Sequence, residues 1–393
     1  MKKKIGIITL PLNTNYGGII QAYALQTIIE KMGFDVYVLA TPRYKFPIDN
    51  KLLYLKRFVK KIVRKYNQAV FLEKEYYESY PVVAQNTEIF IQRYIHRVKI
   101  KDFSCVKVTD FYGFVVGSDQ VWRPSYFRYI KDAYLNFTGN ANVRRIAYAP
   151  SIGIDYWEYS EELTEMCSLL LKKFDAVSLR EDSAVALFAK YMCCNSEHVL
   201  DPTLLLNRED YVKLCRNKIG LESHKSCLLT YLLDPIDESR NVLDKVKQIL
   251  GGEVYRLNKQ TEDCKIKPLD RIALPVEAWF KAFDDAKFVI TDSFHACVFS
   301  IIFHKPFIVL LNKHRGFSRI KSLLRIFKLE NRIVFNSSDI LNIDYNGFDW
   351  DEIDKIMKKW QDKFRYILVD EFQDVNQAQI AFFLIECFKS LGL

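Results

Sequence analysis

The chain contains 393 residues, of which 49% are hydrophobic and 27% are charged, and its formal net charge is +9. This composition is ordinary for a soluble globular protein, and at roughly 150 residues per domain the length predicts two or three domains. No apolar run approaches the roughly 18 residues of a membrane-spanning helix. We also expect no secretory signal in the first ten residues.

Nine cysteines are scattered along the chain, and the adjacent pair Cys193 and Cys194 has no CxxC partner elsewhere. An odd number without metal-ligand spacing predicts reduced, cytosolic thiols and no zinc site. The positive charge suits anionic partners such as phosphorylated metabolites or lipid headgroups, and it does not choose among them.

The first elements form a strand–loop–helix–strand unit. Residues 4–10 are predicted to form a strand, 11–18 a turn-rich loop, 19–32 a helix and 35–40 a second strand. The loop is neither GxGxxG nor GxxxxGK[ST], which argues against a dinucleotide or P-loop site. Gly17 and Gly18 permit the close approach of a ligand, or they serve only a tight turn.

Residues 51–66 combine six apolar residues at helical spacing with seven lysines and arginines. This pattern predicts a basic amphipathic helix. Such a helix could lie on an anionic membrane surface as a peripheral contact, or it could pack one face on the protein and expose the other.

A further strand over residues 111–116 opens into Gly117, Ser118, Asp119 and Gln120. Polar residues therefore gather where a strand ends, and Asp119 is a candidate general base. After a strand over residues 145–149, a first domain of about 155 residues is complete.

A second α/β pattern follows. Strands are predicted at residues 176–179, 198–200, 227–233, 254–257, 288–290 and 306–311. One helix is predicted to follow residues 180–183 and to run through residue 191, and others at 242–250, 275–283 and 296–303. Two Rossmann-like domains facing a cleft give an α/β, GT-B-like fold. We expect domains at 1–155 and 156–345, and a C-terminal part at 346–393 in which helix 349–360 crosses back to the first domain.

His295 lies in the first turn of a predicted helix, directly after a buried strand. The intervening Thr291, Asp292 and Ser293 are residue types that cap helices. In open α/β sheets ligands bind at this edge, where the free N–H groups of a helix start also attract anions. The alternative is a histidine that only packs beside the cap.

Several stretches, taken together and in order, resemble the polysaccharide pyruvyl transferase family. They are KIGIITLPLNTNYGGIIQAYALQ near the start, GSDQVW at 117–122, PSIG at 150–153, VSLREDS at 177–183, VLDPTLLL at 199–206 and TDSFHACVFSIIFHKPFIVLL at 291–311. The resemblance runs from about residue 3 to about residue 350.

The resemblance implies a transferase that moves a pyruvyl group from phosphoenolpyruvate to a sugar of a surface polysaccharide precursor. It implies that His295 lies near the donor and that Arg180 holds the donor's phosphate or carboxylate. One position departs from the family: Ser293 stands where well-characterised members resemble Arg-x-His. Serine cannot form the bidentate ion pair that arginine makes with a carboxylate or phosphate.

Ketal formation from phosphoenolpyruvate needs an acid for the enol carbon, a base for the sugar hydroxyl and groups that hold two anions. A histidine titrates near neutral pH, so His295 is the candidate acid and Asp119 the candidate base. The candidate donor-binding residues are Arg180, Thr291, Asp292 and Ser293. The candidate acceptor- or anion-binding residues are Asn15, Tyr16, Gly17, Gly18, Ser118 and Gln120. We expect no metal and no cofactor, with phosphoenolpyruvate as donor substrate.

Two alternatives stay open: a GT-B-type glycosyltransferase that uses a nucleotide sugar, and a non-catalytic binding protein that has lost the donor site. The expected partner is a sugar or a lipid-linked oligosaccharide acceptor, and no nucleic acid. The expected place of action is the cytoplasm, with the inner face of the membrane as a further option through residues 51–66.

Residues 364–379 resemble the Walker B motif of superfamily 1 DNA helicases, in which Asp370 and Glu371 would hold Mg²⁺. That chemistry requires a GxxxxGK[ST] loop, and the sequence contains none. We therefore interpret the tail as a strand and helix of helicase-like sequence without helicase activity.

Overall fold

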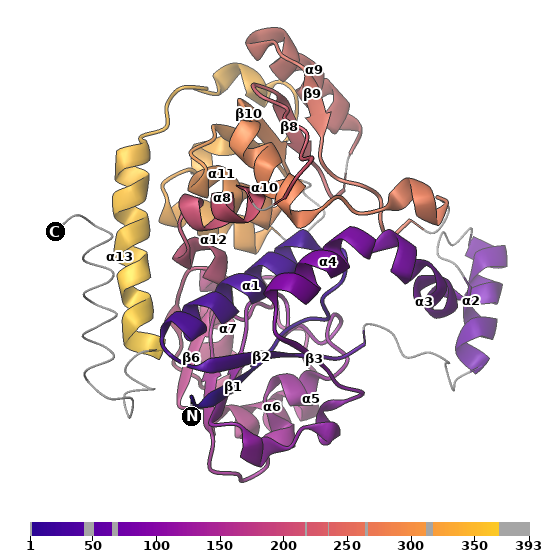
Figure 1. Cartoon of the computed structure of the whole chain (residues 1–393), viewed down its shortest axis with the longest axis vertical. Helices are drawn as coiled ribbons and strands as arrows, with labels where there is room; N and C mark the ends of the chain where they lie inside the picture. Colours follow the sequence, from indigo (N-terminus) through magenta and orange to yellow (C-terminus); the bar gives the residue numbers. More distant parts are fainter. Residues whose placement is uncertain are drawn as a thin grey trace.

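A computed structural model describes residues 2–42, 51–64, 70–216, 218–234, 236–263, 266–311 and 317–368. Two parallel sheets form the two halves of the molecule (Figure 1). The first has the strand order β3-β2-β1-β4-β5-β6-β7 and the second the order β12-β11-β10-β8-β9. Central strands such as β4 and β10 are wholly buried, because helices cover both faces of a parallel sheet.

The strands of the first sheet are β1 (Lys4–Ile8), β2 (Asp35–Ala40), β3 (Arg97–Lys99), β4 (Gly113–Val116), β5 (Arg144–Ala147), β6 (Ala176–Leu179) and β7 (Glu197–His198). Those of the second are β8 (Leu228–Tyr231), β9 (Val254–Arg256), β10 (Phe288–Thr291), β11 (Phe307–Leu310) and β12 (Ile333–Val334). Each strand predicted between residues 4 and 311 is present, with ends within two residues of the expected ones, whereas β3 and β12 were not predicted.

The helices of the first half are α1 (Tyr16–Lys31), α2 (Lys51–Arg64), α3 (Leu72–Val83), α4 (Gln85–Tyr94), α5 (Ile130–Ala133), α6 (Glu161–Leu171) and α7 (Asp182–Met192). Those of the second half are α8 (Arg208–Arg216), α9 (Asp237–Leu250), α10 (Val276–Asp285), α11 (Phe294–Ile302), α12 (Ser318–Ile326) and α13 (Trp350–Leu368). The predicted helix 51–66 is thus α2, and its last two residues lie outside the described part.

The first sheet continues beyond residue 155, where the sequence analysis ended the first domain. β6 pairs with β5, and β7 pairs with β6. Both strands were assigned to the second α/β pattern, so this assignment is wrong. Strand order depends on long-range pairing, which a local apolar run does not reveal.

Helix α13 returns to the first half, as expected for helix 349–360. Trp360 packs edge-on against His198 of β7, with ring centroids 5.1 Å apart. Gln361 Nε2 donates a hydrogen bond of 2.6 Å to the Leu204 carbonyl. The predicted tail strand is wrong at its start, because residues 364–368 are helical, and Asp370 and Glu371 lie outside the described residues.

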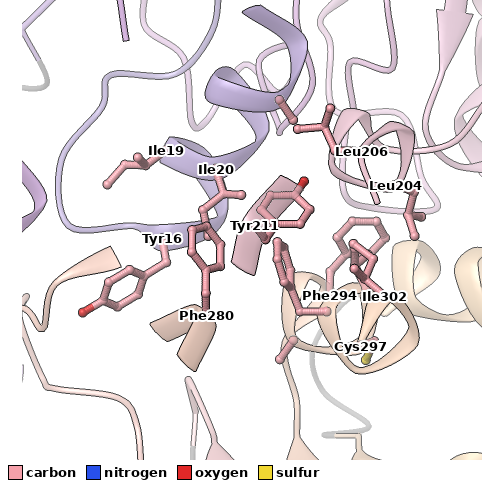
Figure 2. Close-up of a cluster of buried hydrophobic side chains, with 14 of the residues drawn as sticks. Tyr16, Ile19, Ile20, Leu204, Leu206, Tyr211, Phe280, Phe294, Cys297 and Ile302 are labelled. Carbon is pink, nitrogen blue, oxygen red and sulfur yellow. The ribbon is translucent and has the colours of Figure 1, made fainter. Parts of the chain in front are cut away.

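One apolar core joins the two halves. Figure 2 shows Tyr16, Ile19 and Ile20 of α1 facing side chains of the second half, such as Phe280 and Phe294. The Tyr16 ring stacks on Trp279 at 6.0 Å, and its hydroxyl donates to the Leu274 carbonyl at 3.0 Å. A buried apolar interface of this kind favours a fixed relation between the halves over free domain motion.

Candidate functional site

A cavity of about 1060 Å³ opens between the carboxyl ends of the two sheets. The first half contributes residues after β1 and β4, including Asn15, Gly18, Asp119 and Gln120. The second half contributes residues after β8 and β9, including Tyr231 and residues 258–263. This edge is where open α/β sheets bind ligands, as the sequence analysis expected.

His295 occupies the first turn of α11 and is only 8% exposed. Its Nε2 lies 3.7 Å from Asp201 Oδ2, which is too long for a hydrogen bond. On its other side the imidazole packs directly on α1: a Cβ at Gly17 would lie 2.1 Å from His295 Nδ1. Gly17 therefore allows the first half to close onto the histidine of the second.

Arg180 directly follows β6 and is 3% exposed. Its Nη1 donates to Asp201 Oδ2 at 2.8 Å and to Ser118 Oγ at 3.1 Å, and the Phe294 ring lies 4.6 Å from its guanidinium. Burial disfavours the charged form, but the carboxylates of Asp201, Asp119 and Glu181 outweigh it and raise the Arg180 pKa. The guanidinium therefore stays charged inside the protein.

Asp201 links Arg180 to His295, and the sequence analysis missed it. Burial would raise its pKa, but His295, Arg180 and Thr203 together hold that pKa well below its usual range. The carboxylate also accepts a hydrogen bond of 2.8 Å from Ser118 Oγ. The sequence could have indicated Asp201, because this residue follows the strand-like residues 198–200 just as Asp119 follows β4.

Several buried polar atoms around Arg180 have no hydrogen-bond partner within the described ranges. They are Arg180 Nε and Nη2, Asp119 Oδ2, Glu181 Oε2 and His295 Nε2. Buried polar atoms are nearly always hydrogen-bonded in folded proteins, so a cluster of exceptions marks a place for ligand groups. The cluster offers both positive donors and carboxylate acceptors.

Asp119 holds a strained backbone at the wall of the cavity. Its φ is 78°, a left-handed conformation that is uncommon outside glycine. Its Oδ1 accepts from the Gln120 N–H at 2.8 Å and lies 3.9 Å from Arg180 Nη2. Strained backbone conformations are common at functional sites. In this conformation the Asp119 carboxylate lies beside Arg180 at the wall of the cavity.

The loop before α1 has a structural role beside the expected ligand contacts. Asn15 Oδ1 accepts from the Gly18 N–H at 3.4 Å and so caps α1, while Asn15, Tyr16 and Gly18 line the cavity. Gly17 instead faces His295. Its need for glycine comes from this contact.

Thr291 and Asp292 brace the end of β10. Thr291 Oγ1 donates to the Tyr231 carbonyl at 2.6 Å, and the Asp292 carboxylate accepts from the N–H groups of Leu233 and Asp234 at 2.7 and 2.8 Å. Ser293 takes the N-cap position of α11 but makes no side-chain cap bond, contrary to the capping role expected of it. These contacts shape the cavity wall at Leu233 and Asp234.

Because Asp292 is half-buried, we predict that the free energy of unfolding depends on pH. Burial, partly offset by the backbone hydrogen bonds, raises its pKa from 3.8 to about 6. The folded protein therefore binds this proton more tightly than the unfolded chain, and stability falls as pH rises from about 4 to about 6. Relative to Asp292→Asn, the wild type should lose up to about 3 kcal/mol between pH 4 and 7 in urea unfolding. A constant difference across this range would contradict the shift.

Arg319 on α12 lies close enough to Arg180, Asp119 and Glu181 for their charges to act on it, and its position in the sequence gave no sign of this. Ser322, one turn further on, accepts from the Asp182 N–H at 3.1 Å, which fixes α12 beside the residues that follow β6. Arg319 itself is half-buried. Burial and the charge of Arg180 lower its pKa to about 10, while Asp119 and Glu181 act in the opposite direction.

Among the residues described, no three His, Cys, Asp or Glu side chains gather in a way that could hold a metal ion.

Two family models match the chain. A model described as polysaccharide pyruvyl transferase matches residues 15–314, and one described as the UvrD/REP helicase N-terminal domain matches residues 321–388. Where the structure describes the second match, it forms α12, β12 and α13, and Leu324, Val334 and Ile353 of this stretch are buried in the core. A search of curated proteins finds no match.

Solved structures that match this chain have low sequence identity to it. A provisionally named UDP-N-acetylglucosamine 2-epimerase from Listeria monocytogenes is 12% identical, with a TM-score of 0.50 over 96% of this chain and 98% of that one. Arabidopsis thaliana UGT89C1, solved with UDP-L-rhamnose, is 9% identical, with a TM-score of 0.46 over 94% and 95%. The first likeness supports the GT-B-like fold that the sequence predicted, and the fold alone.

Proposed function

Because this chain belongs to the polysaccharide pyruvyl transferase family and is therefore a transferase, we propose that it moves a pyruvyl group from phosphoenolpyruvate to a sugar of a surface polysaccharide precursor. The observation that supports this donor most directly is the buried Arg180, whose Nε and Nη2 have no hydrogen-bond partner among the described residues. A small dianionic donor matches such a guanidinium, since arginine binds carboxylate and phosphate in a bidentate manner.

A second positive group is needed, because Ser293 stands where related enzymes resemble Arg-x-His. Arg319 on α12 is suited to this role. Burial lowers its pKa, and it lies close enough to Arg180 for repulsion between the two positive charges to lower that pKa further. A bound dianion would relieve the repulsion between the two guanidinium groups. In this proposal one arginine holds the carboxylate of the donor and the other its phosphate.

The reaction then needs two additions of oxygen to the same carbon. His295 protonates the enol carbon C3, and C2 becomes electrophilic. One sugar hydroxyl adds to C2 as Asp119 takes its proton; a second hydroxyl then adds as the C2–O bond to phosphate breaks. The products are a cyclic ketal and inorganic phosphate, and the two hydroxyl protons balance the one delivered to C3 and the one carried off with phosphate. Asp119 suits the base role because its Oδ2 has no partner within the described residues.

The cavity suits a sugar acceptor. Its wall carries the aromatic residues Tyr126, Tyr129 and Tyr231, and the polar residues Asn15 and Gln120. We propose that the acceptor sugar lies here, with its hydroxyls toward Asp119. An acceptor carried on a lipid would bring the enzyme to the inner face of the membrane.

Donor identity is tested by ligand-induced stabilisation. Phosphoenolpyruvate at 100 times its Kd should stabilise the protein by about 2.7 kcal/mol. Phospholactate, which keeps both anions but lacks the enol, should stabilise it similarly and release no phosphate when an acceptor is added. Stabilisation by nucleotide sugars instead would support a glycosyltransferase. Stabilisation by neither donor would support a binding protein without a donor site.

Replacing Arg319 by glutamine should weaken phosphoenolpyruvate binding roughly 10- to 100-fold, since a hydrogen bond to a charged group contributes about 1.5–3 kcal/mol. The matched control is Arg325→Gln on the same helix, because the exposed Arg325 pairs only with Asp182 among its described contacts. Titration calorimetry of both variants would measure the effect. Equal affinities for the two variants would remove Arg319 from the donor site.

A further inference from the structure

Helix α2 presents its apolar side to solvent. Six of its apolar residues recur at helical spacing, and each of the six is between 49% and 72% exposed: Leu52, Leu55, Phe58, Val59, Ile62 and Val63. We call these six residues the α2 apolar surface. Leu53 and Tyr54, on the opposite side of the helix, are half-buried. A contiguous apolar surface on a globular protein marks a contact with a partner or a membrane.

The polar side of α2 holds the helix on the protein. Arg57 forms a two-pronged ion pair with Glu73 of α3, with N–O distances of 2.6 and 2.7 Å. Burial would raise the Glu73 pKa, but its hydrogen bonds to Arg57 lower it overall, so the pair is ionised near neutral pH. The same side of α2 carries the half-buried Leu53 and Tyr54, and the Tyr54 ring lies 4.9 Å from that of Phe71. An ordinary amphipathic helix packs its main apolar stripe inward, whereas α2 contacts the protein through Arg57 and these two residues.

The charges beside the α2 apolar surface indicate which kind of partner it binds. Lys56, Lys60 and Lys61 are exposed on the same helix. On a helical projection Lys56 and Lys60 border the apolar stripe on one side, so their long side chains can reach outward to phosphate while the apolar residues enter the acyl boundary. An apolar stripe beside exposed lysines matches a bilayer with anionic headgroups better than an uncharged protein groove.

We propose that α2 is a membrane-docking helix, which lies in the interface of an anionic bilayer with Leu52, Leu55, Phe58, Val59, Ile62 and Val63 inserted. No helix in the described ranges is long and apolar enough to cross a bilayer, so the contact is peripheral. Figure 1 shows α2 and α3 together at one edge of the molecule.

The docking helix lies next to the cavity. Glu73, which holds Arg57, also lines the cavity, as does Pro42 before α2. Docking through α2 would therefore bring the rim of the cavity near the headgroups. This would suit the lipid-linked acceptor of the proposed function, but the docking itself does not depend on which reaction the enzyme performs.

The test is sedimentation of the full chain with phosphatidylglycerol–phosphatidylcholine vesicles and with pure phosphatidylcholine vesicles. We expect the wild type to sediment with the anionic vesicles and to be partly released by salt. Phe58→Asp with Ile62→Asp should abolish sedimentation. Lys56→Glu with Lys61→Glu should weaken it by roughly fivefold or more for each lysine. Arg57 is left intact, because its pair with Glu73 supports the helix.

The matched controls are Leu269→Asp with Leu341→Asp, at exposed apolar positions elsewhere, and Lys358→Glu with Lys359→Glu on the exposed side of α13. Both should sediment like the wild type. Wild-type protein that stays in the supernatant at low salt, or a control that is released as strongly as the α2 variants, would overturn the proposal.

Two further measurements distinguish membrane docking from self-association and from a failure of the proposed function. Sedimentation velocity without lipid should show the same mass for the wild type and Phe58→Asp. If the wild type is a dimer and Phe58→Asp is a monomer, the surface is a self-association site and membrane docking is overturned. Phosphate release with a soluble acceptor should be unchanged in the α2 variants. A failed proposed function would abolish that release in the wild type and leave vesicle binding intact.

Discussion

His295→Ala is expected to fold like the wild type and to lose roughly 10²- to 10⁴-fold in turnover, the range associated with a lost acid–base group. The imidazole is the group positioned to deliver a proton: it lies at the start of α11, its Nε2 is 3.7 Å from the Asp201 carboxylate, and this atom has no hydrogen-bond partner within the described ranges. Phosphate release from phosphoenolpyruvate measures the loss. The control is His304→Ala, at an exposed histidine just beyond the same helix, which should retain activity.

A double-mutant cycle makes this prediction sharper. Gly17→Ala places a methyl group 2.1 Å from His295 Nδ1, so it should displace the imidazole and reduce both stability and turnover. In the His295→Ala background the obstacle is gone, so the same substitution should have little further effect on either quantity. Additive losses would show that Gly17 acts independently of His295. Unchanged turnover in folded His295→Ala protein would remove the histidine from the reaction.

Arg180→Met is expected to cost about 3–5 kcal/mol of unfolding free energy as well as activity. The substitution leaves Asp201 buried without the guanidinium that it accepts from at 2.8 Å, and breaking a buried ion pair on one side typically costs this much. Urea unfolding at pH 7 measures the change. The control is Arg144→Met, whose ion pair with Asp175 is partly exposed and should contribute no more than about 1 kcal/mol.

The pH dependence of this loss has a defined sign. Asp201 has a depressed pKa in the folded protein, so its contribution to stability is present above its unfolded pKa of about 3.9 and is lost as pH falls. The difference between the wild type and Arg180→Met should therefore be largest near neutral pH and shrink below pH 4. A difference that does not change with pH would indicate that the lost stability comes from packing rather than from the charge pair.

Local patterns in the chain predicted most strands and about half of the helices, and they indicated several residues of the candidate site. Strands such as β4 and β10 appear as short apolar runs because parallel strands are buried on both faces. Polar residues at their carboxyl ends indicated Asp119 and His295, because ligands bind at that edge of a parallel sheet. The family resemblance added Arg180. These inferences needed only neighbouring residues and the general geometry of α/β sheets.

Other features depend on contacts between residues that are far apart in the chain. The place of β6 and β7 in the first sheet follows from strand pairing, and the need for glycine at Gly17 follows from the approach of His295 from the other half. Asp201 and Arg319 join the cluster only because the ends of several strands and α12 meet there. The spacing of residues along the chain does not reveal these long-range contacts.

In helix α2, one property followed from the local sequence and another from contacts made in the folded protein. The spacing of its apolar and basic residues was enough to predict an amphipathic helix, but it left open which side would face the protein. In the folded protein the side with Arg57 and the half-buried Tyr54 contacts Glu73 and Phe71, which leaves Leu52 and Ile62 exposed. Periodicity fixes which residues share a face, whereas the direction of that face depends on the partner it meets after folding.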